Sequence, residues 1–220
     1  FEWAIDYYKS MAKKLNITMK LGKEVTAQEV LALKPYSILV ATGSNVISIP
    51  LEGLDQVQTV QAHDVLANDM QFANKKVVVI GGGITGLETA LYINRQGTNQ
   101  VSVVDMLPEW PVDMLDMRYQ NEALLEVRHC NDQGVALFYN NKVVKFADGK
   151  LFIESTKDGE AKALPADVIV LSVGVKPNDA LWQELLASGH PSVWKAGDAI
   201  ATGKINKAVL HGSKFGYSLN

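Results

Sequence analysis

Cysteine and histidine are scarce in this sequence, and their scarcity excludes several kinds of chemistry. Cys130 is the one cysteine in 220 residues, so the chain contains neither a disulfide framework nor a C-x-x-C redox pair. Of the four histidines only His129 stands beside that cysteine, and the others are scattered. This spacing offers no metal-ligand set and no catalytic triad. We therefore expect no metal site and a structural role for Cys130.

An excess of one charge and a long apolar run are also missing. Lys and Arg number 21 against 24 Asp and Glu, and the two signs are interspersed, which argues against nucleic acid or an anionic membrane surface as a partner. No apolar run approaches the ~18 to 20 residues of a membrane span, and the first residues do not read as a signal peptide. The composition, 47% hydrophobic, is that of a globular protein, which we expect to be cytoplasmic.

A glycine-rich turn follows a short β-branched run, Val77 to Ile80, which is typical of a strand buried on both faces. Three of its glycines have the G-x-G-x-x-G spacing: the first allows a tight turn, the second lets backbone approach a pyrophosphate, and the third lets a helix pack on the strand. Unpaired N–H groups and the helix dipole would favour a bound diphosphate there. The residues expected to bind the cofactor in this turn are Gly81, Gly82, Gly83, Ile84, Thr85 and Gly86.

The next stretch supplies a helix and a second strand. An apolar stripe begins at Ile84, and Gly97 stands where a helix C-terminal cap is expected. The following strand, Val101 to Val104, ends at Asp105, which lies 24 positions after Gly81. That is close to the ~20 expected for the carboxylate that accepts hydrogen bonds from the adenosine ribose. The alternative is a glycine-rich turn in an ordinary α/β protein with an incidental acid.

Asp105 also bears on the choice between the two nicotinamide dinucleotides. Its carboxylate would repel a 2′-phosphate, and residues 106–109 contain no Arg or Lys to receive one. We therefore expect NADH to be preferred over NADPH. Arg118 or a distant Lys folding back onto the site would reverse this expectation.

The residues before the turn predict a truncated α/β module. Trp3 to Leu15 has the period of a helix with one buried face, and Ile17, Met19 and Leu21 alternate as in a strand. This module begins with a helix whose preceding strand is missing. The further elements expected before the turn are a helix from a Thr26–Glu29 capping box to about Leu33, a buried strand at Ser37–Ala41, an extended connector at Asn45–Gly53 and a short helix at Ala62–Asn68.

The residues after Asp105 predict one more pair of parallel strands and a small antiparallel meander. The parallel strands are Val135–Phe138 and Asp167–Ser172, the first preceded by a helix at Met114–Arg128. The meander strands are Lys142–Phe146, Leu151–Ser155 and Ala161–Leu164. The tail predicts a helix at Ala180–Ala187, a strand at Ser192–Lys195, a turn at Gly197–Asp198 and a helix from about Asn206 to Leu219.

Four motifs in this order resemble one family. They are ILVATGS at 38–44, GGGITGLE at 81–88, DVIVLSVGVKPN at 167–178 and KAGDAIATGKINKAVLHG at 195–212. With them the chain resembles the C-terminal FAD/NAD(P)-binding half of the old-yellow-enzyme-related NADH:flavin oxidoreductases. That group includes 2,4-dienoyl-CoA reductase, 2-enoate reductase and trimethylamine dehydrogenase, within the pyridine-nucleotide oxidoreductase superfamily.

The resemblance implies an α/β fold in which a Rossmann-like NAD(P)-binding domain is inserted in an incomplete FAD-binding Rossmann-like domain. Residues 1–50 and 178–220 would be the two parts of the FAD domain, and residues 51–177 the NAD(P)H domain. The first FAD strand and its glycine turn would lie upstream, together with a barrel that carries FMN and a 4Fe-4S cluster. We therefore expect at most a partial FAD site in this chain. Homo-oligomerisation stays open.

The resemblance also adds binding residues on the flavin side. Thr42 and Gly43 resemble the crossing point between the two domains, close to the flavin nucleotide. Gly197 and Asp198 resemble the flavin motif in which the carboxylate accepts a hydrogen bond from a ribityl hydroxyl. Alone, a Gly-Asp pair would be read as a surface turn.

On the nicotinamide side the expected contacts are Gly174 and Glu88. The alternative interpretation of Glu88 is a solvent-exposed helix residue without a binding role. The implied reaction is hydride transfer from NADH to FAD, which needs no side-chain acid or base, so no catalytic residue is assigned. Electrons would pass to the missing barrel, which would reduce an unsaturated acid, enone or acyl-CoA.

The alternative function is a non-catalytic ADP-binding module, as in the amine-dehydrogenase branch. A monooxygenase-type flavoprotein is a further alternative, and the missing C-x-x-C disfavours a disulfide reductase.

Overall fold

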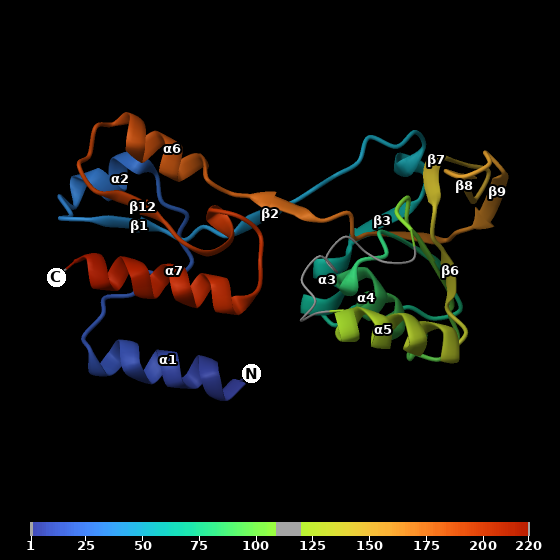
Figure 1. Cartoon of the computed structure of the whole chain (residues 1–220), viewed down its shortest axis with the longest axis horizontal. Helices are drawn as coiled ribbons and strands as arrows, with labels where there is room; N and C mark the ends of the chain where they lie inside the picture. Colours follow the sequence, from blue (N-terminus) through green and yellow to red (C-terminus); the bar gives the residue numbers. More distant parts are fainter. Residues whose placement is uncertain (1, 109–119, 220) are drawn as a thin grey trace. The chain divides into compact units, whose positions relative to one another are not determined.

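The computed structural model of the chain describes residues 2–108 and 120–219 (Figure 1). The chain forms two compact units. One consists of Phe1–Gly43 and Pro177–Asn220, and the other of Ser44–Lys176. We call them the split unit and the central unit, because the sequence of the second interrupts that of the first.

A five-stranded parallel sheet forms the middle of the central unit, in the order β3–β10–β4–β5–β6. β-Branched residues dominate β4 and β10, and these strands are buried on both faces, as expected for a parallel sheet covered on both sides. The strands are β3 (Gln58–Gln61), β4 (Lys76–Ile80), β5 (Gln100–Val104), β6 (Ala136–Phe138) and β10 (Val168–Leu171). Because the strands are parallel, their carboxyl ends share one edge, where the glycine turn lies.

Alternation along β4 divides the core into two layers. Val77 and Val79 pack with the helices on one face of the sheet, while Val78 and Ile80 pack on the other face. The helices are α3 (Ala62–Ala67), α4 (Ile84–Asn94) and α5 (Gln120–Asp132). The start that the sequence predicted for the last of these, Met114, lies outside the described residues.

The second face of the sheet is covered by the antiparallel meander, ordered β7–β8–β9 as predicted. Its strands are β7 (Asn141–Ala147), β8 (Lys150–Ser155) and β9 (Ala161–Pro165). Phe146, Leu151 and Ile153 point from it into the core layer with Val78 and Ile80. This layer therefore takes its residues from strands far apart in the sequence.

Two short strands carry the chain into and out of the central unit. β2 (Ser44–Val46) pairs with β11 (Val175–Pro177), so the expected connector begins as a strand rather than as an isolated extended segment. The N–H of Ile47 donates to the carbonyl of Gly174 at 3.1 Å. The 3-10 turn η1 (Leu54–Gln56) then leads into β3.

In the split unit, two parallel strands pair and two helices pack on them. Ile38, Val40 and Leu185 form its small core. The strands are β1 (Ile38–Val40) and β12 (Val193–Lys195), and the packed helices are α2 (Ala27–Ala32) and α6 (Ala180–Ala187). The remaining elements are α1 (Glu2–Lys14), η3 (Gly197–Ala199) and α7 (Ile205–Ser218).

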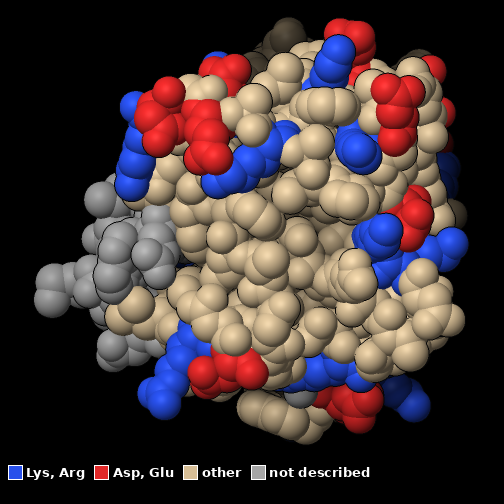
Figure 2. All heavy atoms as spheres, turned by 90° about the vertical axis from the view of Figure 1, so that its right-hand side faces the viewer, with Lys and Arg blue, Asp and Glu red and all other residues tan. Residues whose placement is uncertain are grey.

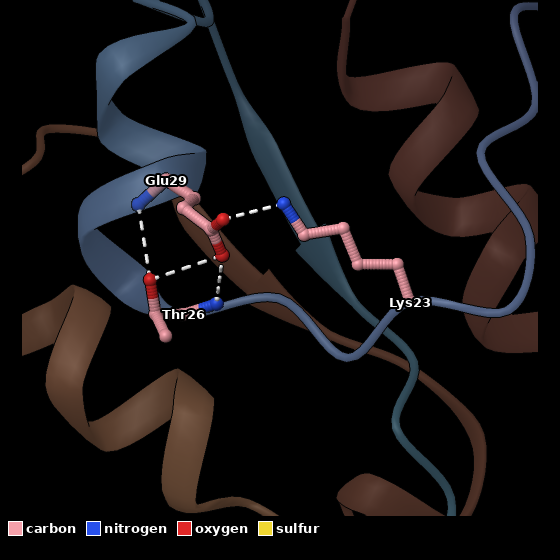
Figure 3. A network of polar contacts seen from close by, with 3 residues as sticks. All are labelled: Lys23, Thr26 and Glu29. Carbon is pink, nitrogen blue, oxygen red and sulfur yellow. Dashed lines mark hydrogen bonds and ion pairs between the residues drawn. The ribbon is translucent and has the colours of Figure 1, made fainter.

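Helix α2 starts at the predicted capping box (Figure 3). The Glu29 N–H donates to Thr26 Oγ1 at 3.2 Å, and the Thr26 N–H donates back to Glu29 Oε2 at 3.0 Å. Lys23 reaches the other carboxylate oxygen and forms an ion pair with it. This reciprocal pair satisfies backbone donors that a helix of six residues would otherwise leave open.

Two predictions for the N-terminal residues are wrong. Helix α1 forms, but none of its residues is buried, and Trp3 is 77% exposed. No strand forms at Ile17–Leu21, where Ile17 is 56% exposed and Leu21 is 83% exposed. A strand needs a neighbour for its backbone groups, and among the described strands none pairs with this segment.

Charge is mixed over the surface shown in Figure 2. Lys and Arg side chains stand next to Asp and Glu side chains around an area of uncharged residues. Among the described residues drawn on this face, the two signs of charge are therefore interspersed. Among the described residues, no helix is both long and apolar enough to cross a membrane.

Candidate functional site

The glycine turn lies at the carboxyl end of β4, where two other segments come very close to it. Gly81 has φ +110°, and a Cβ there would lie 2.2 Å from the carbonyl oxygen of Ser172, just beyond β10. At Gly86 a Cβ would lie 1.9 Å from the carbonyl oxygen of Gly81. Gly81 and Gly86 must therefore be glycine because backbone carbonyl oxygens leave no room for a Cβ. This agrees with the roles that the G-x-G-x-x-G spacing predicted for the first glycine in the turn and for the third in helix packing.

The first turn of α4 offers backbone donors to a ligand. Gly83 is the N-cap residue, in extended conformation, and no side chain caps the helix. Within the described part of the chain no acceptor is bonded to the N–H groups of Gly83, Ile84, Thr85 and Gly86. Four such donors together with the positive end of the helix dipole are suited to bind an anion. They lie at the turn to which the sequence assigned the diphosphate.

Asp105 lies beside this turn, at the carboxyl end of the neighbouring strand β5. Its Oδ2 accepts the N–H of Gly82 at 2.6 Å, and its Oδ1 accepts the N–H of Leu107 at 2.8 Å. The structure thus brings together the turn and the acid that the sequence placed 24 positions apart. Each carboxylate oxygen has two lone pairs, so both oxygens can still accept a hydroxyl.

Sequence reasoning missed Tyr139 and Asn141, which follow β6. A Cβ at Gly82 would lie 2.8 Å from Tyr139 Cε1, and the Tyr139 hydroxyl lies 3.4 Å from the Gly82 carbonyl oxygen. Asn141 is buried and donates its N–H to the Asp105 carbonyl at 2.9 Å. The signal that could have found them is position, because the carboxyl end of a third parallel strand shares the edge with the turn.

The two residues expected on the nicotinamide side lie apart from these contacts. Glu88 is exposed on α4, one helical turn beyond the first. Gly174 has φ +95° and links β10 to β11, with open space around it except for Ile47 Cδ1 at 4.0 Å. Neither residue takes part in the hydrogen bonds that join Gly82 and Leu107 to Asp105.

The residues expected near the flavin follow two paired strands of the split unit. Thr42 and Gly43 come after β1, where the Thr42 hydroxyl donates to the Asn178 carbonyl and the Asn178 N–H donates to the Gly43 carbonyl at 2.9 Å. Gly197 and Asp198 come after β12. Since β1 and β12 are parallel neighbours, both pairs stand at the carboxyl edge of that small sheet.

The Gly197–Asp198 turn is held by two contacts that the sequence did not indicate. The Gly197 N–H donates to His211 Nδ1 on α7 at 3.2 Å. Asp198 Oδ1 accepts the N–H of Gly203, just before α7, at 3.1 Å. Helix α7 therefore fixes the turn in which the resemblance places the ribityl contact.

Cys130 takes no part in either site. It is fully buried on α5, in the same core layer as Leu87 of α4. Burial raises the pKa of its thiol to about 12, so the reactive thiolate is disfavoured at neutral pH. Its position agrees with a structural role.

The fold and the site together define a class. A parallel sheet with a glycine turn at the end of one strand, an uncapped helix start and an acid at the end of the next strand is a doubly wound dinucleotide-binding fold. The particular family follows from comparison with known proteins. The chain belongs to the pyridine nucleotide-disulphide oxidoreductase family, whose model matches residues 5–212.

Relatives agree with the resemblance seen in the motifs. The chain is 29% identical over 226 residues to an NADH oxidase of Thermoanaerobacter brockii, covering 99% of this chain and 33% of that protein. It is 32% identical over 175 residues to a bilirubin reductase of Mediterraneibacter gnavus, covering 80% and 26%. A solved 2-naphthoyl-CoA reductase complex matches with a TM-score of 0.81 at 27% identity, covering 97% and 31%.

These matches confirm the expected fold and the expected group of relatives. The chain spans about a third of the length of the NADH oxidase, so it corresponds to one part of such proteins. Family membership implies binding of FAD and NAD(P). The amides of Gly83 to Gly86, which bind no acceptor in the described part of the chain, and the Asp105 carboxylate beside this turn fit the ADP half of a dinucleotide.

Proposed function

We propose that this chain is the nucleotide-binding part of a flavin-dependent oxidoreductase in which NADH passes hydride to FAD. Residues 51–177 would bind NADH, and residues 1–50 with 178–220 would supply part of the FAD site. The observation that carries the proposal is the bond from the Gly82 N–H to Asp105 Oδ2, which puts this carboxylate next to the amides of Gly83 to Gly86, and these bind no acceptor among the described residues.

Each group has a defined task in this site. The amides of the α4 start bind the diphosphate, and the remaining lone pairs of Asp105 accept the 2′- and 3′-hydroxyls of the adenosine ribose. A 2′-phosphate would instead meet the negative carboxylate, and Met106 to Pro108 supply no cation to receive it. The site therefore favours NADH over NADPH. Glu88 and Gly174 would contact the nicotinamide side.

On the flavin side, Thr42, Gly43, Gly197 and Asp198 would contact FAD, which when bound supplies the hydride acceptor. The carboxylate of Asp198 accepts the Gly203 N–H, which holds it in this turn. The rest of the protein would hold FMN and a 4Fe-4S cluster in a barrel and reduce an unsaturated acid, enone or acyl-CoA. The 2-naphthoyl-CoA reductase among the similar structures supports the last of these classes.

Calorimetric titration of the chain with ADP, NADH and NADPH tests the proposal. We expect ADP and NADH to bind, NADPH to bind about tenfold or more weakly, and Asp105→Asn to weaken ADP binding by about 10- to 100-fold, the value of hydrogen bonds to a charged group. Asp132→Asn removes an exposed acid from α5 and serves as the charge-matched control. A folded chain that binds no adenine nucleotide would refute the proposal.

A non-catalytic ADP-binding module is the second candidate. It is favoured by the contrast between the two halves of the site: the ADP half rests on several described contacts, whereas the nicotinamide half rests on Glu88 and Gly174 alone. The full-length protein mixed with NADH and an artificial electron acceptor separates the two. NADH oxidation supports the enzyme, and ADP binding without oxidation supports the passive module.

A further inference from the structure

The peptide of Gly82 is held from two sides by side chains of other strands. Its N–H donates to Asp105 Oδ2 at 2.6 Å, and its carbonyl oxygen lies 3.4 Å from the Tyr139 hydroxyl. The edge of the Tyr139 ring is so close that an added methyl on Gly82 would lie 2.8 Å from Cε1. Both polar groups of Gly82 thus face protein atoms.

Gly82 consequently plays a different part from its neighbours in the turn. Its N–H is already bonded to Asp105, whereas the next four amides have no acceptor among the described residues. The diphosphate would therefore bind to those four amides, and Gly82 would set the direction of the carboxylate. The absence of a side chain at Gly82 makes room for the tyrosine ring.

Main-chain bonds fix Tyr139 relative to Asp105. The Asp105 N–H donates to the Phe138 carbonyl at 3.0 Å, and the Asn141 N–H donates to the Asp105 carbonyl at 2.9 Å. The buried Asn141 side chain also donates from Nδ2 to the Tyr139 carbonyl at 2.8 Å. The tyrosine, the acid and the glycine peptide are therefore parts of one rigid arrangement at the ends of β4, β5 and β6.

We propose that Tyr139 is a positioning residue of this site: its ring holds the Gly82 peptide so that the N–H stays on Asp105 Oδ2, and so aims the carboxylate at the ribose diol. This inference rests on the proposed function of the site. The hydroxyl contact is longer than an ordinary O–H···O bond, so the ring contributes more than the hydroxyl. Tyr139 acts through Asp105 and needs no contact with the diphosphate.

The test compares ADP with 2′,3′-dideoxyadenosine 5′-diphosphate, which keeps the diphosphate but lacks the hydroxyls that Asp105 would bind. We expect the unmodified chain to prefer ADP by about tenfold or more. Tyr139→Phe, which keeps the ring, should retain this preference within about twofold. Tyr139→Leu should lose most of it while its affinity for the dideoxy ligand changes by less than about threefold. Combining Tyr139→Leu with Asp105→Asn should cause no further loss, because the two act as one unit.

The outcomes separate this inference from the proposed function. If Tyr139→Leu keeps the full preference for ADP, or weakens both ligands equally, Tyr139 does not position Asp105, while the dinucleotide site itself stands. If the unmodified chain binds neither ligand, the proposed function and this inference both fail. Should Tyr139→Leu not fold, Gly82→Ala provides the second test, since its methyl would lie 2.8 Å from the tyrosine ring and 3.2 Å from Asp105 Cβ and so disturb the same arrangement. A Gly82→Ala variant with unchanged preference would overturn the inference.

Discussion

At the scale of single residues, Gly86 is the position where packing overrides helix propensity. An added Cβ would overlap the Gly81 carbonyl oxygen at 1.9 Å and lie 3.3 Å from Ser172 Oγ. Gly86 lies inside α4, where alanine would ordinarily be preferred by about 0.5 to 1 kcal/mol. The glycine is thus retained against helix propensity because the helix start must pack directly on the turn.

Gly86→Ala should destabilise the central unit by about 1 to 3 kcal/mol, the usual cost of forcing an atom into a packed region, and should abolish ADP binding. The matched control is Gly212→Ala in α7, where nothing lies within 4 Å of the added methyl. That change should leave stability unchanged or raise it by about 0.5 to 1 kcal/mol. Urea unfolding followed by circular dichroism measures both, and equal effects of the two substitutions would contradict the packing argument.

Glu29 is the second residue with a measurable consequence. The hydrogen bond from Lys23, followed by that from the Thr26 backbone, lowers the pKa of its carboxyl to about 2 from an ordinary 4.5. A carboxyl whose pKa is lower in the folded state stabilises the fold above its unfolded pKa, and this contribution is lost as the pH falls toward the folded pKa. The relevant window is therefore between about pH 4.5 and pH 2.

Glu29→Gln should remove this pH dependence. We expect the unmodified chain to lose stability of the split unit as the pH falls through that window, and the variant to show a shallower loss because its side chain does not titrate. Unfolding at a series of pH values reports the slope, and the 13C shift of the Glu29 carboxyl reports the pKa directly. Glu24→Gln, at an exposed position outside the capping box, is the control. An ordinary pKa at Glu29 would show that the contacts in Figure 3 do not persist in solution.

At the scale of elements, burial divides the helices and strands into two groups. Four of the five residues of β4 and every residue of β10 are buried, whereas α1 and α7 contain no buried residue. A helix of ordinary length gains most of its stability from packing an apolar face. Helix α1 should therefore be formed only part of the time in the isolated chain, whereas α7 is held to the split unit by the bond from Gly197 to His211.

Hydrogen exchange should show this difference. We expect the amides of β4 and β10 to exchange at least about 100-fold more slowly than those of α1, since slow exchange requires opening of the buried sheet. Mass spectrometry of peptides covering each element provides the measurement, repeated at several protein concentrations. Protection of α1 that equals that of β4 would contradict the expectation. If such protection rose with concentration, α1 would be packing against a second copy.

The sequence predicted those elements whose signal is local. The β-branched run of β4, the glycine spacing and the capping box at Thr26 each lie within a few residues, and the structure has all three. Two predictions that needed a neighbour failed: the Ile17–Leu21 strand has no partner among the described strands, and the apolar side of α1 stays exposed. The sequence did not predict Tyr139 as a site residue because its position also depends on a neighbouring strand: only the pairing of β5 with β6 brings it to Gly82.

At the scale of the whole molecule, each unit has a core of its own. The central unit has apolar layers on both faces of its sheet, and the split unit has the smaller cluster around Ile38, Val40 and Leu185. A ligand that binds one unit stabilises that unit in proportion to the logarithm of its concentration over Kd. The two cores therefore predict two unfolding transitions that respond differently to ADP.

ADP should raise only the transition of the central unit. In a Trp110→Phe variant the remaining tryptophans, Trp3, Trp182 and Trp194, all belong to the split unit, so fluorescence follows that unit alone. Circular dichroism records both units, whereas fluorescence records the split unit, so the transition seen by circular dichroism alone belongs to the central unit. At an ADP concentration of about 100 times Kd we expect the free energy of unfolding to rise by about 2.7 kcal/mol for that transition and to stay unchanged for the one that fluorescence follows. Equal shifts by both probes would show that the units unfold together. Adenosine without phosphate is the control ligand.

The pairing of β2 with β11 has a consequence for engineering. The chain enters the central unit at Ser44 and leaves it at Lys176 through two adjacent strands, so its ends already lie next to each other. Residues 44–176 can then be treated as a cassette, which could be transplanted into a surface hairpin of another host or circularly permuted through a short new loop at little entropic cost. Because the two strands are adjacent, a short peptide linker could also replace residues 44–176 and join the two segments of the split unit directly.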